Sequence, residues 1–321
     1  MPSARARAKT KRTNNRRDKG RDPRALVLSP SLLKRFALPQ PDDDDDKEER
    51  GRVLVVGGAA EMPGAVILAA TAALRAGAGK LQIATARSIS QLVAAAVPEA
   101  RVFALPETKT GALAVSAAGT IAEHANRVQA VLIGPGMVDE EAVARLLKSL
   151  LPLINGPTLI LDAAALACVS ADAKCLHRLK GEVVLTPHAG EMASMLGEEK
   201  AHITVDPLAT ARRAAHELRA VVALKGAKTY IAAPGVEEIY CNQTGNVGLA
   251  TSGSGDTLSG IIVGLAARGA RPLQAAIWGV YLHGSAGDKL AKRMGRLGFL
   301  ARELLAEVPS LMSRLDGARK R

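Results

Sequence analysis

Short apolar runs of β-forming residues alternate with longer Ala- and Leu-rich stretches along the chain from Arg52 onward. The first run, Val53–Val56, is followed by the helix-length stretch Ala65–Ala76. The later runs are Leu81–Ala84, Val131–Ile133, Leu159–Leu161, Val183–Leu185 and Val221–Leu224. Strands that are apolar on both faces and separated by helices form parallel sheets covered on both sides. The sequence therefore predicts a three-layer α/β fold with a central, mostly parallel sheet.

The remaining patterns complete this prediction. Tyr230–Ala233 and Glu238–Tyr240 flank Pro234-Gly235, which predicts a hairpin at one edge of the sheet. Further helices are expected at Leu26–Leu38, as a short docking helix, and at Thr257–Arg268, Pro272–Met294 and Phe299–Leu311.

The net charge of +12 is concentrated at the two ends of the chain. Residues 1–24 hold ten Lys and Arg against two Asp, and residues 312–321 hold four against one, which leaves +1 for the body. Blocks of like charge repel and do not pack. We expect a disordered basic arm (1–24), a short helix and acidic linker (25–50) containing Asp42–Asp46, a folded domain (51–311) and a basic tail (312–321).

Composition narrows the function classes. Aromatic residues make up 2% of the chain, which argues against a base-stacking surface. Cys168, Cys175 and Cys241 are too few and too scattered for a disulfide framework or a thiolate metal site. The N-terminus lacks a secretory apolar stretch, residues 1–24 lack the apolar face of a transit peptide, and Thr71 breaks the longest apolar run. We expect a cytoplasmic protein without a membrane span.

The most informative stretch is Asn242–Gly260, in which Ser252–Asp256 leads directly into an apolar helix. Small residues at a helix start let several N–H groups face one point, which suits the oxygens of a transferring phosphoryl group. A carboxylate at Asp256 would then take a proton from an attacking hydroxyl. The structural alternative is an Asp near a helix cap with glycines that serve only a turn.

Two common phosphate-binding patterns are absent from the sequence. Gly79-Lys80 lacks both the upstream glycine and the following Ser or Thr of a Walker A loop. Gly253-x-Gly255 is followed by Leu258 where the dinucleotide fingerprint has its third glycine.

Seven stretches between Arg52 and Arg268 resemble, in order and spacing, the NAD(P)H-hydrate dehydratase family of the ribokinase-like superfamily. They are GGAAEMPGA (57–65), AALRAGAGK (72–80), IGPGM (133–137), LDAAAL (161–166), VLTPHAGE (184–191), ALKGAKT (223–229) and NQTGNVGLATSGSGD (242–256). Departures from the family pattern fall at residues 59–62, at Ala164 and at Ser252-Gly253.

The resemblance implies repair of the S-epimer of hydrated NAD(P)H, in which ADP or ATP phosphorylates the C6 hydroxyl and loss of phosphate restores the ring. Asp256 would be the base, and Gly253, Ser254 and Gly255 would form the anion hole. The hydrate would contact Ala65, Gly136 and His188, and Asp162 would brace the pocket. The implied nucleotide-binding residues are Lys225, Gly226, Ala227, Lys228, Thr229 and Gly255.

The resemblance further implies Mg²⁺ near Glu191, bound through water, and a homotetramer. Taken alone, these residues have structural alternatives: His188 as a structural histidine, Lys225–Thr229 as an ordinary turn and Glu191 as a solvated side chain.

Two other functions remain open at this point. A small-molecule kinase of the same fold would phosphorylate a hydroxyl and stop, and it would use Asp256 in the same way. A nucleic-acid-binding protein would act through the basic residues 1–24.

Overall fold

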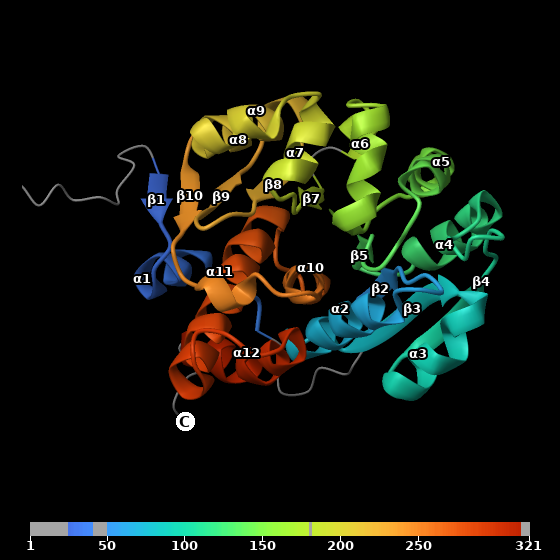
Figure 1. The fold of residues 1–321 in the computed structure, drawn as a ribbon, viewed down its shortest axis with the longest axis horizontal. Helices are drawn as coiled ribbons and strands as arrows, with labels where there is room; N and C mark the ends of the chain where they lie inside the picture. The colour runs from blue at the N-terminus through green and yellow to red at the C-terminus, as the bar shows by residue number, and fades with distance from the viewer. Residues whose placement is uncertain (1–24, 41–49, 180–181, 316–321) are drawn as a thin grey trace, which may run out of the picture.

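The computed structural model describes residues 25–40, 50–179 and 182–315, which form a ten-stranded sheet between helical layers (Figure 1). The strand order is β1-β10-β9-β8-β7-β6-β5-β2-β3-β4. In chain order the strands are β1 (Ala25–Val27), β2 (Arg52–Val56), β3 (Lys80–Ala86), β4 (Arg101–Leu105), β5 (Ala130–Ile133), β6 (Thr158–Leu161), β7 (Val183–Leu185), β8 (Val221–Leu224), β9 (Thr229–Ala232) and β10 (Ile239–Asn242).

Within this sheet only β9 is antiparallel to its neighbours. It pairs antiparallel with β8 and β10, and every other pairing, including that of β1 with β10, is parallel. The carboxyl ends of β2, β5, β6, β7 and β8 therefore meet along one edge of the sheet, where ligands bind in open α/β folds.

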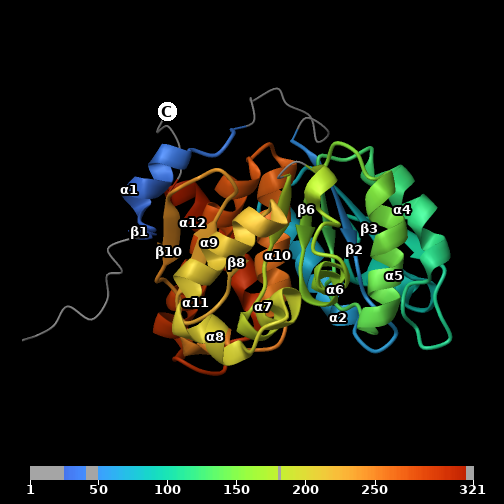
Figure 2. The same ribbon diagram turned by 90° about the horizontal axis from the view of Figure 1, so that it is seen from above.

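Helices cover both faces of the sheet (Figures 1 and 2). One layer, uppermost in Figure 1, holds α4 (Ala118–Ala125), α5 (Glu140–Leu150), α6 (Ala167–Ala171), α7 (Ala189–Leu196), α8 (Lys200–Val205) and α9 (Pro207–Leu218). The other holds α2 (Pro63–Arg75), α3 (Ser90–Ala96), α10 (Ser254–Ala267), α11 (Pro272–Met294) and α12 (Ala301–Leu315). The short α1 (Pro30–Leu33) lies beside β1.

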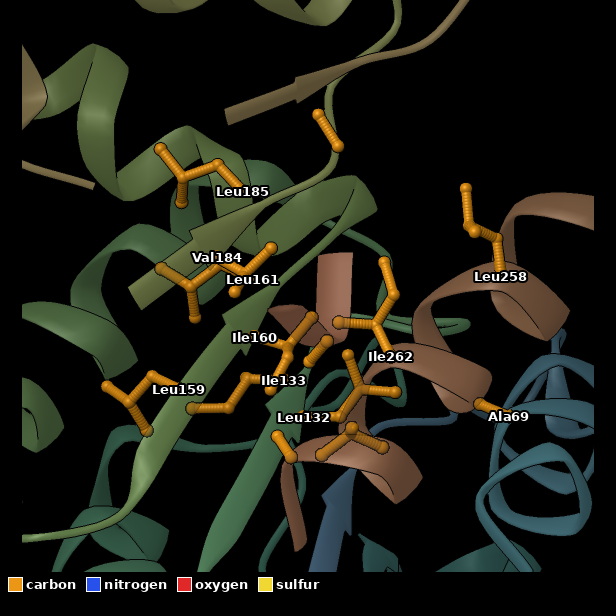
Figure 3. Close-up of a cluster of buried hydrophobic side chains, with 14 of the residues drawn as sticks. Ala69, Leu132, Ile133, Leu159, Ile160, Leu161, Val184, Leu185, Leu258 and Ile262 are labelled. Atoms are coloured by element: carbon orange, nitrogen blue, oxygen red, sulfur yellow. The ribbon is translucent and has the colours of Figure 1, made fainter. Parts of the chain in front are cut away.

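Part of the hydrophobic core lies between the sheet and α10 (Figure 3). Leu132, Ile160 and Leu161 on the central strands and Ile262 on α10 are fully buried. Removing such side chains from water contributes about 1.5–3 kcal/mol each, which fixes α10 on the sheet. Since α10 begins at Ser254, this packing also sets where the Gly-rich turn lies.

Helices α2 and α10 cross at very short range. A Cβ at Gly260 would lie 2.3 Å from the Ala69 carbonyl oxygen, and one at Gly264 would lie 2.4 Å from that of Ala73. Larger residues at either glycine would push the helices apart. The two glycines therefore hold the middle and C-terminal parts of α10 close to those of α2.

The structure confirms the three-layer fold with a mostly parallel sheet, the predicted central strands and the antiparallel pairing of β9 with β10. In the described part of the chain, every helix is too short or too polar to span a bilayer. Residues 1–24, 41–49 and 316–321, which include the basic arm, the Asp42–Asp46 run and most of the basic tail, lie outside the described residues.

Two sequence predictions were wrong. Leu26–Leu38 is not one helix, because residues 25–27 form β1 and only α1 and a 3₁₀ turn, Lys34–Phe36, follow. The hairpin is not the edge of the sheet, because β1 pairs with β10 and covers it. The sequence analysis also missed β4, a half-exposed edge strand whose apolar signal is short.

Candidate functional site

The candidate site lies at the carboxyl ends of the central strands. Asp162 directly follows β6, His188 lies three residues after β7, and Lys225 directly follows β8. An isolated parallel bridge joins His188 to Lys225. Three segments that are far apart in the sequence are thus brought to one place by the strand order.

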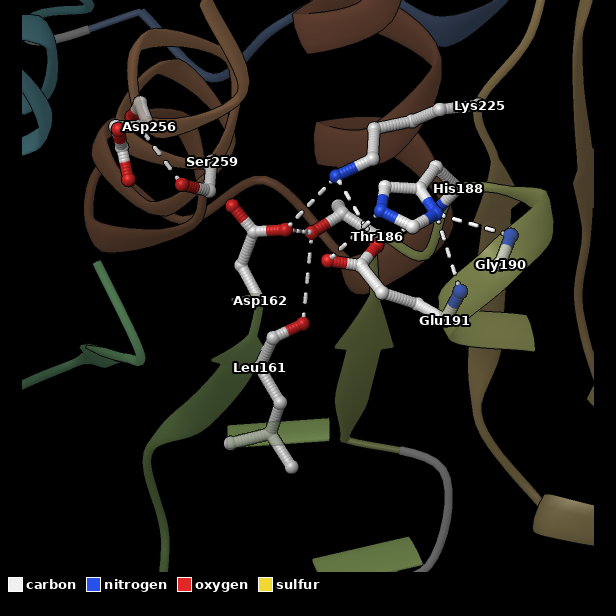
Figure 4. Close-up of polar contacts among 9 residues, drawn as sticks. All are labelled: Leu161, Asp162, Thr186, His188, Gly190, Glu191, Lys225, Asp256 and Ser259. Carbon is white, nitrogen blue, oxygen red and sulfur yellow. Dashed lines mark hydrogen bonds and ion pairs between the residues drawn. The ribbon is translucent and has the colours of Figure 1, made fainter. Parts of the chain in front are cut away.

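The Lys225 ammonium is held between two carboxylates (Figure 4). Its Nζ lies 3.0 Å from Asp162 Oδ1 and 3.6 Å from Glu191 Oε2. The Thr186 hydroxyl donates to the same Asp162 oxygen at 2.7 Å. Burial alone would lower the pKa of Lys225, but Asp162 and Glu191 outweigh it and raise this pKa above its usual value. Lys225 is therefore a fixed positive charge.

The turn 253–255 leads into α10. Gly253 is the N-cap with φ +84°, a left-handed conformation suited to glycine, and no side chain caps the helix. A Cβ at Gly255 would lie 3.7 Å from Lys225 Nζ, so the turn faces the lysine. The Ser254 N–H donates to the Thr251 carbonyl at 3.2 Å, so this member of the predicted anion hole already has a partner in the chain.

Asp256 lies in the first turn of α10 and is half-buried. The described residues give its carboxylate no ion-pair partner, because Lys225 pairs with Asp162 and Glu191 instead. Burial, and then the Asp162 carboxylate, raise the pKa of Asp256 to about 6, although Lys225 opposes them. A carboxylate with this pKa is ionised at neutral pH and is a better proton acceptor than an ordinary Asp.

His188 caps α7 and still has one nitrogen to offer. Its Nδ1 accepts hydrogen bonds from the N–H groups of Gly190 and Glu191, both at 3.0 Å, and Glu191 Oε2 accepts from the His188 N–H at 2.7 Å. Since Nδ1 accepts, the neutral ring carries its proton on Nε2. Nε2 lies 3.7 Å from Glu191 Oε1, and the His188 side chain is 60% exposed, so a ligand can reach this nitrogen.

A cavity of about 790 Å³ opens beside the turn. Of the predicted nucleotide-binding residues, Lys225, Gly226, Ala227, Thr229 and Gly255 line it, whereas Lys228 does not. Ser254 and His188 also line it. The cavity is thus bounded by the β8–β9 turn on one side and by the start of α10 on another.

Ala65 and Gly136 lie together, outside the lining of this cavity. Gly136 has φ +66°, and a Cβ there would lie 2.9 Å from the Ala65 Cβ and 2.5 Å from the Met62 carbonyl oxygen. The same loop touches the site, because a Cβ at Gly134 would lie 1.8 Å from the Asp162 carbonyl oxygen. Asp256 is likewise not among the residues lining the cavity, but it adjoins Gly255, which is.

Sequence reasoning missed the part of the cavity wall that α11 supplies, where Val280, His283 and Gly284 line it. Residues 244–247 and 249–251, from the stretch that the sequence analysis singled out, also line the cavity. Two side chains hold this wall together: the Asn242 amide donates to the Thr244 carbonyl, and the Asn246 side-chain oxygen accepts from the Gly248 N–H. The available signal for His283 was its place directly after the apolar run Ala275–Leu282.

The chain matches known proteins over most of its length. The family described as NAD(P)H-hydrate dehydratase matches residues 53–310. An ADP-dependent (S)-NAD(P)H-hydrate dehydratase from Xanthomonas campestris is 45% identical over 91% of this chain and 98% of its own length. A protein of the same name from Bacillus subtilis is 33% identical over 88% of this chain and 96% of its own length.

Solved structures agree with this match. An ADP/ATP-dependent NAD(P)H-hydrate dehydratase from Bacillus subtilis, co-crystallized with ATP/Mg²⁺, has a TM-score of 0.74 at 30% identity and covers 91% of this chain and 99% of that one. A ribokinase-like superfamily protein from Enterococcus faecalis has a TM-score of 0.77 at 28% identity, covering 90% and 95%. With a ribokinase-like fold and matches along nearly its full length, the chain belongs to the NAD(P)H-hydrate dehydratase family.

Proposed function

We propose that this protein repairs hydrated NAD(P)H as an ADP-dependent hydro-lyase that acts on the S-epimer, with ATP as the alternative phosphoryl donor. The observation that carries the proposal is the state of Asp256: a half-buried carboxylate with a pKa of about 6 and no ion-pair partner in the described residues, one residue from the cavity-lining Gly255. The names of the relatives support this choice of reaction over a kinase that stops at the phosphorylated product.

The nucleotide fits the cavity that Lys225, Gly226, Ala227, Thr229 and Gly255 line. Lys225 supplies a positive charge held in place by Asp162 and Glu191, which favours the phosphates of ADP. The N–H groups of Gly253 and Gly255 at the start of α10 add partial positive charge toward the same phosphates.

In this proposal the hydrate binds where Ala65 and Gly136 lie together. Small residues there permit close approach of a flat ring to the backbone. The exposed Nε2–H of His188 would donate a hydrogen bond to a polar group of the substrate. In this arrangement the C6 hydroxyl lies between Asp256 and the nucleotide phosphates.

The chemistry follows from this arrangement. Asp256 takes the proton of the C6 hydroxyl as its oxygen attacks the terminal phosphorus, and the bond from that phosphorus to the rest of the nucleotide breaks. The turn and Lys225 stabilise the charge on the transferring phosphoryl oxygens. The C6–O bond then breaks with loss of phosphate, and the neighbouring ring carbon gives up a proton to water as the double bond forms.

The residues present fit a Mg²⁺ ion that travels with the nucleotide. The described residues contain no group of three potential His, Cys, Asp or Glu ligands, but Mg²⁺ usually keeps waters and phosphates with one or two carboxylates. Glu191, 22% exposed and beside Lys225, would hold such an ion through water. When bound, the ion neutralises phosphate oxygens.

A cytoplasmic location and a homotetrameric assembly are further parts of the proposal. The location follows from a substrate that belongs to the nicotinamide nucleotide pool and is supported by the three free cysteines. The tetramer rests on the family resemblance, and light scattering of the purified chain tests it. A monomer of 33.4 kDa in solution would contradict it.

The decisive test incubates the purified protein with S-hydrated NADH and either ADP or ATP. We expect the dihydronicotinamide absorbance to recover and phosphate to be released in equal amount. A stable phosphorylated product without recovery would establish the kinase alternative. Gly136→Val, which closes the space beside Ala65, should raise KM for the hydrate while ADP binding stays near the wild-type level.

A further inference from the structure

Helix α11 contributes part of the cavity wall, and one of its side chains reaches the turn 253–255. His283 Nε2 lies 3.0 Å from the Ser254 hydroxyl, and both residues line the cavity. Ser254 is only 4% exposed, so its hydroxyl has little access to water. The orientation of this buried hydroxyl is therefore set mainly by the imidazole.

The same helix holds the loop that faces the turn. Asp288 accepts hydrogen bonds from the Gly245 N–H at 2.9 Å and from the Asn246 side-chain amide at 3.1 Å. Two glycines between His283 and Asp288 let the loop lie directly on the helix. A Cβ at Gly284 would be 2.2 Å from the Thr244 hydroxyl oxygen, and one at Gly287 would be 2.7 Å from the Leu249 side chain. The sequence His283-Gly284-x-x-Gly287-Asp288 thus fixes two parts of the cavity from one rigid element.

We infer that His283 is a positioning residue for phosphoryl transfer: through the Ser254 hydroxyl it fixes the turn 253–255 against the nucleotide phosphates. This inference rests on the proposed function, because it assigns a role within the same reaction. His283 is not a catalytic residue in it, since no proton passes through the imidazole. Asp288 fixes the loop 244–249 in the same way, through its hydrogen bonds to Gly245 and Asn246.

The charge state of the ring suits this role. Burial and the nearby Lys225 lower the pKa of His283 to about 4, and a contact with the Ser254 backbone only partly offsets them. The ring is therefore neutral at physiological pH, with one N–H and one lone pair. A neutral imidazole can hold a hydroxyl without competing with Lys225 for the phosphates, whereas a second cation would draw them away from Asp256.

The test compares His283→Leu, His283→Gln, Ser254→Ala and the double variant His283→Leu/Ser254→Ala. Removing the hydrogen bond from either side should lower kcat about tenfold and leave KM for the hydrate unchanged, because the turn acts on the transferring phosphoryl group. The amide of His283→Gln can occupy the place of Nε2, so kcat should return to within about threefold of wild type. The double variant should be no slower than either single variant, since both remove one interaction.

The matched control is His124→Leu, which makes the same change at a half-buried histidine that stacks on Phe103 at the far end of the sheet. Its kcat should stay within about twofold of wild type. Melting temperatures of all variants separate loss of fold from loss of positioning. Additive losses in the double variant, or a His283→Leu enzyme as fast as His124→Leu, would overturn the inference.

Calorimetric titration with ADP gives a readout that does not depend on turnover. His283→Leu and Ser254→Ala should weaken ADP binding by the same factor, about threefold, and the double variant by no more. If the wild-type protein failed to dehydrate the hydrate, the proposed function would be wrong. The coupling between His283 and Ser254 in ADP binding could still be measured in that case. Independent effects of the two variants on ADP binding would instead refute the positioning role itself.

Discussion

Among individual side chains, the ionisation of Asp256 controls the predicted reaction. Only its carboxylate form accepts a proton, and its pKa is raised to about 6 by burial and by Asp162. We expect kcat/KM for the hydrate to rise with pH along an acid limb with an apparent pKa near 6. Rates measured across the acid range in constant-ionic-strength buffers check this. A limb near pH 4 would mean that another group limits the reaction.

Replacing Asp256 by Asn removes the base while keeping the size of the side chain. Turnover of the hydrate should fall by about 10²–10⁴, with little change in ADP binding, because the cavity lining is untouched. Stopped assays with high enzyme concentration and parallel ADP titrations measure the two effects. Near-normal turnover in this variant would remove Asp256 from the mechanism.

The same substitution should stabilise the fold. Because the folded-state pKa of Asp256 is above its ordinary 3.8, the folded protein binds the extra proton more tightly, and stability is lost as pH rises from about 4 to 6. Above pH 6 the cost reaches up to about 3 kcal/mol, which Asp256→Asn should recover. Urea unfolding at pH 4 and pH 8 checks this: the gain should appear mainly at pH 8. An equal gain at both pH values would contradict it.

Several candidate site residues were named from the sequence, Asp256 from its Gly-rich stretch and Lys225 and His188 from the family resemblance, but their partners were not. Asp256, Lys225 and His188 follow strand ends or open a helix, and such positions can be read from local pattern. The ion pair of Lys225 with Asp162 joins residues 63 positions apart, and the bond between Ser254 and His283 joins residues 29 apart. Such contacts depend on how helices and strands pack, which local pattern does not specify.

The crossing of α2 and α10 makes a prediction about helix packing. Gly260→Ala places a Cβ 2.3 Å from the Ala69 carbonyl oxygen, so the helices must separate, at a cost of about 1–3 kcal/mol. Because α10 carries Asp256 at its start, kcat should fall along with the melting temperature. Thermal unfolding and hydrate turnover measure both.

Gly119→Ala is the matched control for this change. Gly119 is an exposed helix glycine on α4 with no atom within 4 Å of its would-be Cβ. The substitution there should stabilise the protein by about 0.5–1 kcal/mol and leave turnover unchanged. If Gly260→Ala and Gly119→Ala had the same effect on melting temperature and turnover, close helix packing would not explain why residue 260 is a glycine.

The elements that were predicted wrongly are those whose conformation comes from a distant partner. Three residues, Ala25–Val27, carry no periodic signal, and they are a strand because β10 offers its edge: the Leu28 N–H also donates to the Cys241 carbonyl at 2.9 Å. The central strands were recognisable because burial on both faces leaves an uninterrupted apolar run. Edge strands such as β4 keep half their residues exposed and lose that signal.

For the whole molecule, the N-terminal segment divides into two parts with different expected roles. Residues 28–38 are anchored: Leu33 is fully buried, and the Trp278 indole donates to the Phe36 carbonyl at 2.6 Å. Deleting residues 1–24 should leave the melting temperature and turnover unchanged, whereas deleting 1–40 should lower the free energy of unfolding by several kcal/mol. Thermal unfolding of the two truncated chains tests this, and equal stability would contradict it.

The shorter deletion also tests nucleic-acid binding by the basic residues. It removes ten Lys and Arg, so any affinity for a polyanion, together with its dependence on salt, should disappear while repair activity remains. Titration with duplex DNA at two salt concentrations measures this. Undiminished binding after the deletion would place the polyanion site on the folded domain.

The pairing of β1 with β10 has a consequence for biosynthesis. Ala25 is made early, but its partner Ile239 leaves the ribosome only after some two hundred further residues. During translation the first strand must wait without its neighbour, and contacts so distant in sequence slow the final step of folding. The nascent chain therefore cannot complete its sheet until most of the polypeptide has emerged. A stalled or prematurely ended translation product would leave β1 unpaired and open to aggregation and proteolysis.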